Sequence, residues 1–189
     1  MIVCDPLCYL LWAFLLLVLP LSWLLSAACA ALIHEFGHLA AVLTFGEQIR
    51  KIRICPGGCV IETGEMAEPK QILCILAGPM ASLSLLFFRR KFPLIALLGL
   101  FQGMYNLLPV LPMDGGRVAQ ILLYRIFPKK ADVLMTRVQY VSVFLAAWGI
   151  IRVGIIHSAG VFPWILAGIW LLRMLPRKIP CKEPKIGVQ

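Results

Sequence analysis

The sequence predicts an all-α polytopic membrane protein with about six transmembrane helices and a small β-hairpin between the second and third helices. Two observations carry this prediction. Of the 189 residues, 61% are hydrophobic and only 14% are charged, so the polar residues are too few to cover a soluble globule of this size. The apolar residues also fall into runs that are long enough for helices in a bilayer.

The apolar runs define the predicted helices in chain order. The apolar region at 7–45 predicts two helices. Pro20 interrupts it, and a single helix over its whole length would be nearly twice as long as a bilayer needs. The predicted membrane helices cover about 7–19, 23–45, 72–88, 92–111, 133–156 and 161–175. A short amphipathic helix is expected at 117–127, and residues 176–189 form a basic tail that we expect to be disordered. The whole of 1–175 is predicted to be one membrane domain.

Residues 46–71 predict the hairpin, because β-branched residues flank a turn that is rich in glycine. An exposed strand edge there can hold another chain in an extended conformation. The candidate substrate-binding residues of this hairpin are Ile52, Ile54, Gly57 and Gly58. The alternative is an ordinary solvated loop.

The charge and the cysteines exclude two other classes. The net charge is +9, but the basic residues form short clusters between apolar runs, as in cytoplasmic loops beside anionic lipid, so no nucleic-acid partner is expected. Seven cysteines, several of them within apolar runs, do not indicate a disulfide framework. Cys55 and Cys59 bracket the hairpin turn without further Cys or His nearby, which does not favour a second zinc site.

The sequence His34-Glu35-Phe36-Gly37-His38 places two imidazoles and a carboxylate inside an apolar run. On a helix, His34 and His38 share one face and can bind the same tetrahedral cation. Glu35 then lies beside them and can take a proton from an activated water. The alternative is a pair of satisfied core histidines with a surface glutamate, but ionisable groups at membrane depth are costly and usually functional.

Two histidines leave a catalytic zinc site one protein ligand short. Asp114 is the candidate, because it lies where two prolines and two glycines break a helix at membrane depth. The other two aspartates are less suitable as the third ligand, because Asp5 is close to the terminus and Asp132 follows an interfacial pair of lysines. In the alternative reading, Asp114 only caps the following helix.

These residues resemble the site-2 protease family of intramembrane zinc metalloproteases. The matching motifs are His34 to His38, the segment from Asn106 through Pro109 to Asp114-Gly115-Gly116, and Ala77-Gly78-Pro79. The hairpin sequence and Asn106-Leu107-Leu108-Pro109 are most similar to the sporulation branch that processes pro-sigma factors. The resemblance covers about 30–120 well and the remainder only by hydropathy.

The resemblance implies one zinc ion per chain, bound by His34, His38 and Asp114. It also implies that Asn106 orients the substrate or supports the oxyanion, and that Pro109 lies among the substrate-binding residues.

Two residues depart from the family pattern. Ser82 stands where many members have Asn, and Met113 replaces the usual Leu. Neither a PDZ insertion nor a CBS domain is expected.

The predicted activity is hydrolysis of a peptide bond in a membrane-inserted or membrane-associated protein, with Glu35 as the base. A zinc-binding membrane scaffold and a zinc transporter are the alternatives. A scaffold does not need the base Glu35, and a transport site usually carries more carboxylates at membrane depth. A different protease with a downstream glutamate ligand is disfavoured, because Glu183 in the tail is the only Glu after residue 68. The sequence leaves open the substrate, the trigger and an inhibitory membrane partner.

If all six helices cross the bilayer, one side collects 14 of the 18 Lys and Arg residues. The excess of basic residues predicts that this side is cytoplasmic. Both termini and the active site would then lie on the cytoplasmic side of an integral membrane protein.

Overall fold

The computed structural model describes residues 2–4, 15–17, 19–55, 58–64 and 66–156. The chain divides into two compact units, Met1–Met135 and Thr136–Gln189. The predicted helix at 161–175 and the basic tail lie outside the described residues, as does most of the predicted helix at 7–19, of which residues 15–17 are helical.

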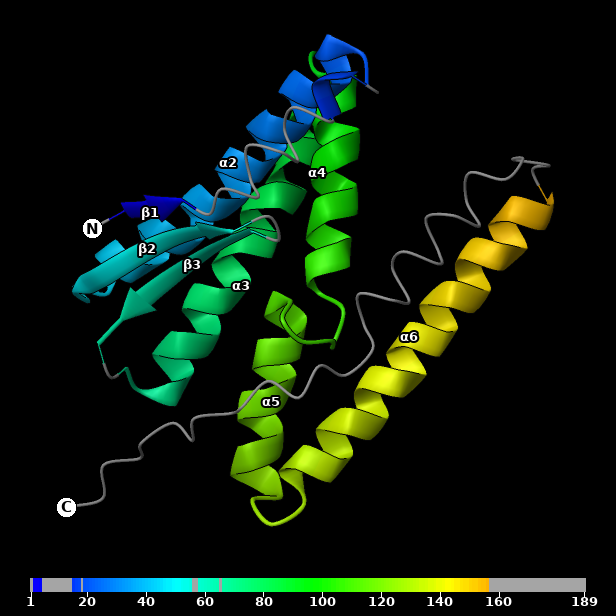
Figure 1. Ribbon diagram of the computed structural model, residues 1–189. Coiled ribbons are helices and arrows are strands. Elements are labelled where there is room, and N and C mark those ends of the chain that lie inside the picture. Colours follow the sequence, from blue (N-terminus) through cyan, green and yellow to red (C-terminus); the bar gives the residue numbers. More distant parts are fainter. Residues whose placement is uncertain (1, 5–14, 18, 56–57, 65, 157–189) are drawn as a thin grey trace. The chain divides into compact units, whose positions relative to one another are not determined.

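Three helices of the first unit pack against one another (Figure 1): α2 (Leu21–Thr44), α3 (Glu68–Ser84) and α4 (Pro93–Asn106). Helix α2 begins after Pro20 and ends before Gly46, whose φ of 71° an L side chain rarely adopts. A Cβ atom on Gly37 would lie 2.6 Å from the carbonyl oxygen of Ala77. The glycine therefore allows α2 and α3 to approach closely.

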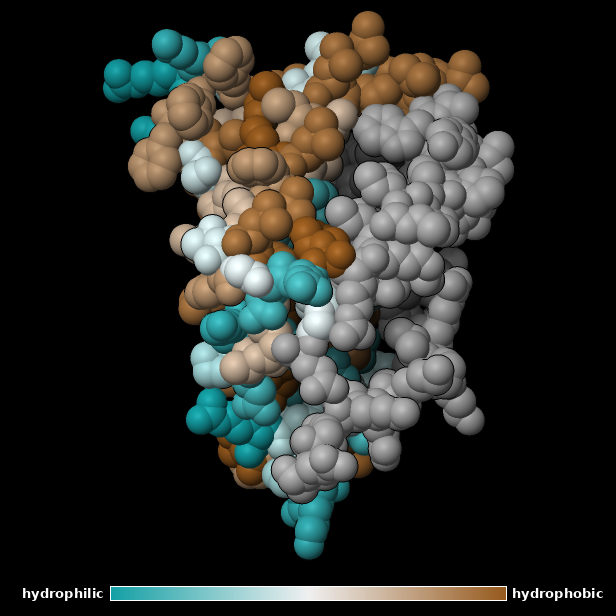
Figure 2. Space-filling model, turned by 90° about the vertical axis from the view of Figure 1, so that its left-hand side faces the viewer, coloured by the Kyte–Doolittle hydropathy of each residue, from teal (hydrophilic) through white to brown (hydrophobic). Residues whose placement is uncertain are grey.

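Two segments among the described residues are long and apolar enough to cross a bilayer, namely Leu21–Thr44 and Glu68–Phe88. The second consists of α3 and the 3-10 turn η1 (Leu85–Phe88). Leu32 is 71% exposed and Phe36 is 67% exposed, as expected where hydrocarbon covers the helix. In Figure 2, hydrophobic (brown) residues gather in the upper half of the face beside a hydrophilic (teal) group at its upper left edge, and hydrophilic residues are more frequent in the lower half.

The expectation of six crossing helices is not confirmed within the described part of the chain, which contains these two candidate spans. The predicted helix at 92–111 is too long, because α4 ends at Asn106. With 14 residues, α4 is about 21 Å long, which is shorter than the hydrocarbon core of a bilayer.

A three-stranded sheet lies where the sequence predicts the hairpin. Its strands are β1 (Ile2–Cys4), β2 (Ile49–Cys55) and β3 (Gly58–Thr63), in the order β1-β2-β3. Strand β2 pairs antiparallel with β3, so that Ile52 faces Ile61, and parallel with β1, so that Ile52 also faces Ile2. The parallel pairing with β1 is a feature that the sequence did not predict.

The pairing corrects one expectation about the strand edge. Ile52 and Ile54 have strand partners on both sides of β2, so their backbone cannot accept a further chain. Among the described strands, β3 and β1 are the edges of the sheet.

After α4 the chain leaves the helix at 107–113 and enters α5 (Asp114–Ile126). The two glycines at the start of α5 pack directly on this irregular segment. A Cβ atom on Gly115 would overlap the carbonyl of Leu107, and one on Gly116 would overlap the carbonyl of Val110. Because they lack side chains, the two glycines allow the first turn of α5 to pack against the irregular segment at 107–113. Helix α5 begins three residues earlier than the predicted helix at 117–127.

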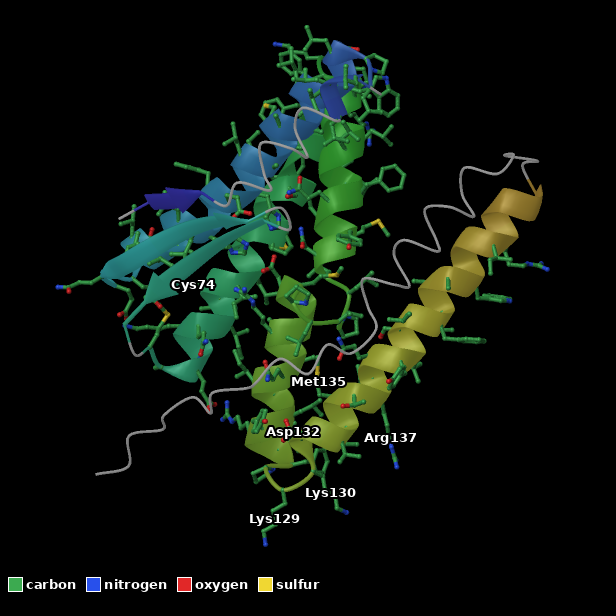
Figure 3. All side chains as sticks on the ribbon, in the orientation of Figure 1. Cys74, Lys129, Lys130, Asp132, Met135 and Arg137 are labelled. Carbon is green, nitrogen blue, oxygen red and sulfur yellow. The ribbon has the colours of Figure 1, made fainter. Side chains whose placement is uncertain are left out.

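Helix α6 (Ala131–Ile156) corresponds to the predicted helix at 133–156. The turn that precedes it carries Lys129 and Lys130, whose side chains point away from the helices (Figure 3). The hydroxyl of Tyr124 donates a hydrogen bond to the carboxylate of Asp132. This bond ties the end of α5 to the first turn of α6.

Candidate metal centre and adjoining cavity

His34 and His38 lie one turn apart on α2 and direct their Nε2 atoms toward the same point. The two Nε2 atoms are 3.2 Å apart. His34 is buried, with 3% of its surface exposed, and His38 is half-buried. The i, i+4 spacing of the motif therefore places both rings on one helix face, as the sequence predicts.

Asp114 joins the two histidines from α5. Its Oδ2 atom lies 3.1 Å from Nε2 of His34 and 3.3 Å from Nε2 of His38. Met113 occupies the N-cap position, and no side-chain capping bond is present there. The Asp114 carboxylate lies in the first turn of α5 and faces the histidines. We call His34, His38 and Asp114 the metal-ligand cluster.

The separations within the cluster fit a tetrahedral ion. Ligand atoms about 2.0–2.2 Å from zinc, at tetrahedral angles, lie about 3.3–3.6 Å from one another. The three separations here are 3.1, 3.2 and 3.3 Å, so one lies at the lower end of that range and the other two are 0.1–0.2 Å below it. Three side chains from two helices therefore already surround a space of the right size for one zinc ion.

The hydrogen bonds behind the rings leave the Nε2 atoms available. Nδ1 of His38 lies 2.9 Å from the carbonyl oxygen of Cys74. A carbonyl only accepts, so Nδ1 carries the proton, and Nε2 of the neutral ring presents its lone pair. Nδ1 of His34 lies 2.9 Å from the hydroxyl of Ser82, which can accept in the same way. This is the outer arrangement that metal-binding histidines commonly have.

Helix α3 supplies both supports and also makes room for the second ring. A Cβ atom on Gly78 would overlap the imidazole of His38. Gly78 of the Ala77-Gly78-Pro79 motif therefore leaves the space that the His38 ring occupies. The sequence did not reveal that Ser82 contacts His34, because the two residues are 48 positions apart.

Three other predicted site residues lie on α2, at the end of α4 and in the segment that follows it. Glu35 is half-buried on α2 beside His34, and its Oε2 atom is shielded from solvent. Asn106 is the last residue of α4, and Pro109 lies in the irregular segment that follows. The catalytic roles of Glu35 and Asn106 and the substrate contact of Pro109 remain predictions.

A cavity of about 410 Å³ opens beside the cluster and includes His38 and Asp114 in its wall. The remaining lining residues come mostly from four elements: Val42 of α2; Ile61 and Thr63 of β3; Gln71, Cys74 and Ile75 of α3; and Arg117, Gln120 and Ile121 of α5, with Met66 before α3. Figure 3 shows Cys74 on α3 beside the sheet. An edge strand and the cluster thus face the same space.

The cavity adds residues to the candidates for substrate binding. Pro109 is described and does not line it. The side chains of Ile52 and Ile54, the surroundings of Gly58 and the whole of Gly57 lie outside the described part of the structure, so their contacts with substrate stay predictions. Ile61 and Thr63 of β3 join them as candidates, because both line the cavity. The sequence predicted a hairpin but carried no signal for which strand would form the edge beside the metal-ligand cluster.

Comparisons with known proteins agree with this site. Residues 88–146, less than a third of the chain, match the profile of Peptidase family M50. A zinc metalloprotease of Methanocaldococcus jannaschii is 29% identical over 126 residues, which cover 59% of this chain and 35% of the relative. Stage IV sporulation protein FB of Bacillus subtilis is 29% identical over 140 residues, which cover 67% of this chain and 47% of the relative. The chain thus matches less than half the length of either relative.

A solved structure shares the fold. The site-2 protease of Methanocaldococcus jannaschii has a TM-score of 0.56 and 20% sequence identity, over 89% of this chain and 84% of that chain. The resemblance to site-2 proteases seen in the sequence motifs is confirmed. Together with the two candidate spans, it supports an integral membrane protein.

Proposed function

We propose that this chain, a relative of the site-2 proteases of peptidase family M50, is an intramembrane zinc metalloendopeptidase. The observation that carries the proposal is the metal-ligand cluster, with its three ligand atoms 3.1–3.3 Å apart at the wall of a cavity. Glu35 of the same helix turn adds the carboxylate that hydrolysis needs. A scaffold would not require this combination.

The protein groups divide the chemistry between them. When bound to His34, His38 and Asp114, zinc supplies a Lewis acid for the scissile carbonyl and an activated water. Glu35 accepts the proton of that water and returns it to the leaving amide nitrogen. By resemblance to the family, Asn106 orients the substrate or supports the developing oxyanion.

The substrate is a membrane-inserted or membrane-associated protein that must be locally extended, because a helix hides its amide groups. The edge strand β3 offers backbone groups for pairing on the side away from β2. Ile61 and Thr63 of this strand line the cavity that leads to the cluster. A substrate strand paired with β3 would therefore bring a peptide bond close to His38 and Asp114.

The sequence resemblance to the sporulation branch favours a membrane-associated pro-sigma factor as the substrate. An inhibitory membrane partner would act most directly by covering β3, since this edge lies on the route to the cluster.

The excess of basic residues on one side favours an orientation with the cluster near the cytoplasmic leaflet and the C-terminus on the cytoplasmic side, where the N-terminus also lies if the first predicted helix crosses. Cysteine probes at Gln48 and Lys130, on a background without other cysteines, should react only with reagent that reaches the cytoplasm. A probe at Lys91 should react only from the other side. Labelling of Gln48 and Lys130 from opposite faces would contradict this orientation.

Glu35→Gln tests the proposed activity. It keeps the size of the side chain but removes the base, so cleavage of a co-expressed membrane-anchored pro-protein should fall about 100-fold or more. Bound zinc, measured on the purified protein, should remain at one per chain. Glu68→Gln is the matched control, because Glu68 is exposed at the start of α3 and should leave cleavage unchanged. Near-normal cleavage by zinc-loaded Glu35→Gln would assign the base to another residue.

A further inference from the structure

Ser82 is a fully buried side chain behind His34, with 0% of its surface exposed. Its hydroxyl lies 2.9 Å from Nδ1 of His34, on the side of the ring away from the metal-ligand cluster. Ser82 is not among the described residues that line the cavity. Its position therefore does not support contact with substrate, and any effect on the chemistry must pass through His34.

The Ser82 hydroxyl makes a different kind of contact from four other helical hydroxyls in the described part of the chain. Serine and threonine hydroxyls in helices commonly bond to a carbonyl in the preceding turn of their own helix. Ser26, Thr44, Ser84 and Ser142 do so here. The oxygen of Ser82 instead lies within hydrogen-bond distance of a side chain on another helix, Nδ1 of His34 on α2.

The main chain of Ser82 is also held in place. A Cβ atom on Gly99 of α4 would lie 2.9 Å from the carbonyl oxygen of Ser82. The glycine thus lets α4 press against α3 at the residue that contacts His34. Ser82 is fixed from one side by α4 and reaches α2 on the other.

We propose that Ser82 is a positioning residue for His34 as a zinc ligand. Its hydroxyl accepts the Nδ1–H hydrogen bond, which selects the tautomer with a free Nε2 and turns that atom toward His38 and Asp114. This inference rests on the proposed zinc site. It gives Ser82 a function of its own at the position where many site-2 proteases have Asn.

His38 provides an internal comparison. Its Nδ1 is bonded to the main-chain carbonyl of Cys74, which a side-chain substitution does not remove. Replacing Ser82 should therefore loosen His34, whereas replacing Cys74 should leave the support of His38 in place.

The test measures zinc affinity of the full chain in detergent by competition with a chelator, and the visible spectrum of the cobalt-substituted protein. Ser82→Ala should raise the zinc dissociation constant about 10- to 100-fold, the range found when such outer partners are removed. The cobalt ligand-field bands should shift as well. Ser82→Thr keeps a hydroxyl and should recover most of the affinity. The exposed Ser84→Ala on the same helix should stay within about twofold of the unmodified chain.

A second variant, which keeps the volume of the side chain, allows the test to be made even if the alanine variant does not fold. If Ser82→Ala does not yield folded protein, Ser82→Cys retains the size but bonds weakly, so its zinc affinity should also fall. Unchanged zinc affinity and an unchanged cobalt spectrum in Ser82→Ala or Ser82→Cys would overturn the inference. An equal loss in Ser84→Ala would overturn it too, because the effect would then not depend on the contact with His34. Absence of zinc binding by the unmodified chain would instead overturn the proposed function, and this inference with it.

Discussion

The metal-ligand cluster and the strand β3 face the same cavity, but they are built in different ways. The cluster takes its residues from α2 and α5 and its supports from α3, where buried small residues allow close approach. Strand β3 is paired only with β2 among the described strands. Zinc chemistry requires ligands placed within about half an ångström, whereas strand addition requires backbone groups that are left unpaired. One region must be closed by packing and the other must stay open.

The largest expected effect comes from removing a ligand of the cluster. His34→Ala and Asp114→Ala should each reduce zinc from one per chain to a small fraction when measured by metal analysis after dialysis, because each deletes one of three protein ligands. Full zinc occupancy in Asp114→Ala would mean that Asp114 is not a ligand. Asp132→Ala is a control, since Asp132 bonds to Tyr124 away from the cluster and should keep its zinc.

A smaller effect is expected when only the packing of the cluster changes. Gly78→Ala places a methyl group in the space of the His38 ring, and displacement of that ring should weaken zinc binding by about 10- to 100-fold. Gly149→Ala is the matched control, because a Cβ atom there meets nothing within 4 Å. If zinc titrations gave the same affinity for both variants, close packing around His38 would not be needed for binding.

The smallest expected effect concerns the open region. Ile61→Ala removes apolar surface from the cavity wall but leaves the cluster intact. A loss of about 1–2 kcal/mol of substrate binding corresponds to a KM about 5- to 30-fold higher, with kcat and zinc content nearly unchanged. The exposed Leu25→Ala on α2 is a control for the loss of an apolar side chain. A fall in zinc content in Ile61→Ala would show that the two regions are not separable.

Local sequence information predicted the parts of the protein that depend on neighbours along the chain. The helical spacing of His34 and His38 placed both rings on one face, and the run of apolar residues located α2 nearly to its ends. The break near Asp114 was also visible, because prolines and glycines interrupt a helix whatever lies around them. The end of α4 was placed too late, since apolar residues continue through the irregular segment after Asn106.

The sequence by itself determined the ligand types and the helices that carry them, because helix periodicity and residue chemistry are local properties. Only the tertiary structure decided that β1 pairs with β2 and leaves β3 as the edge beside the cavity. Only the tertiary structure brought Ser82 to His34, across 48 residues of chain. Such pairings depend on how whole helices and strands pack, and the pattern of residues along one segment does not contain that information.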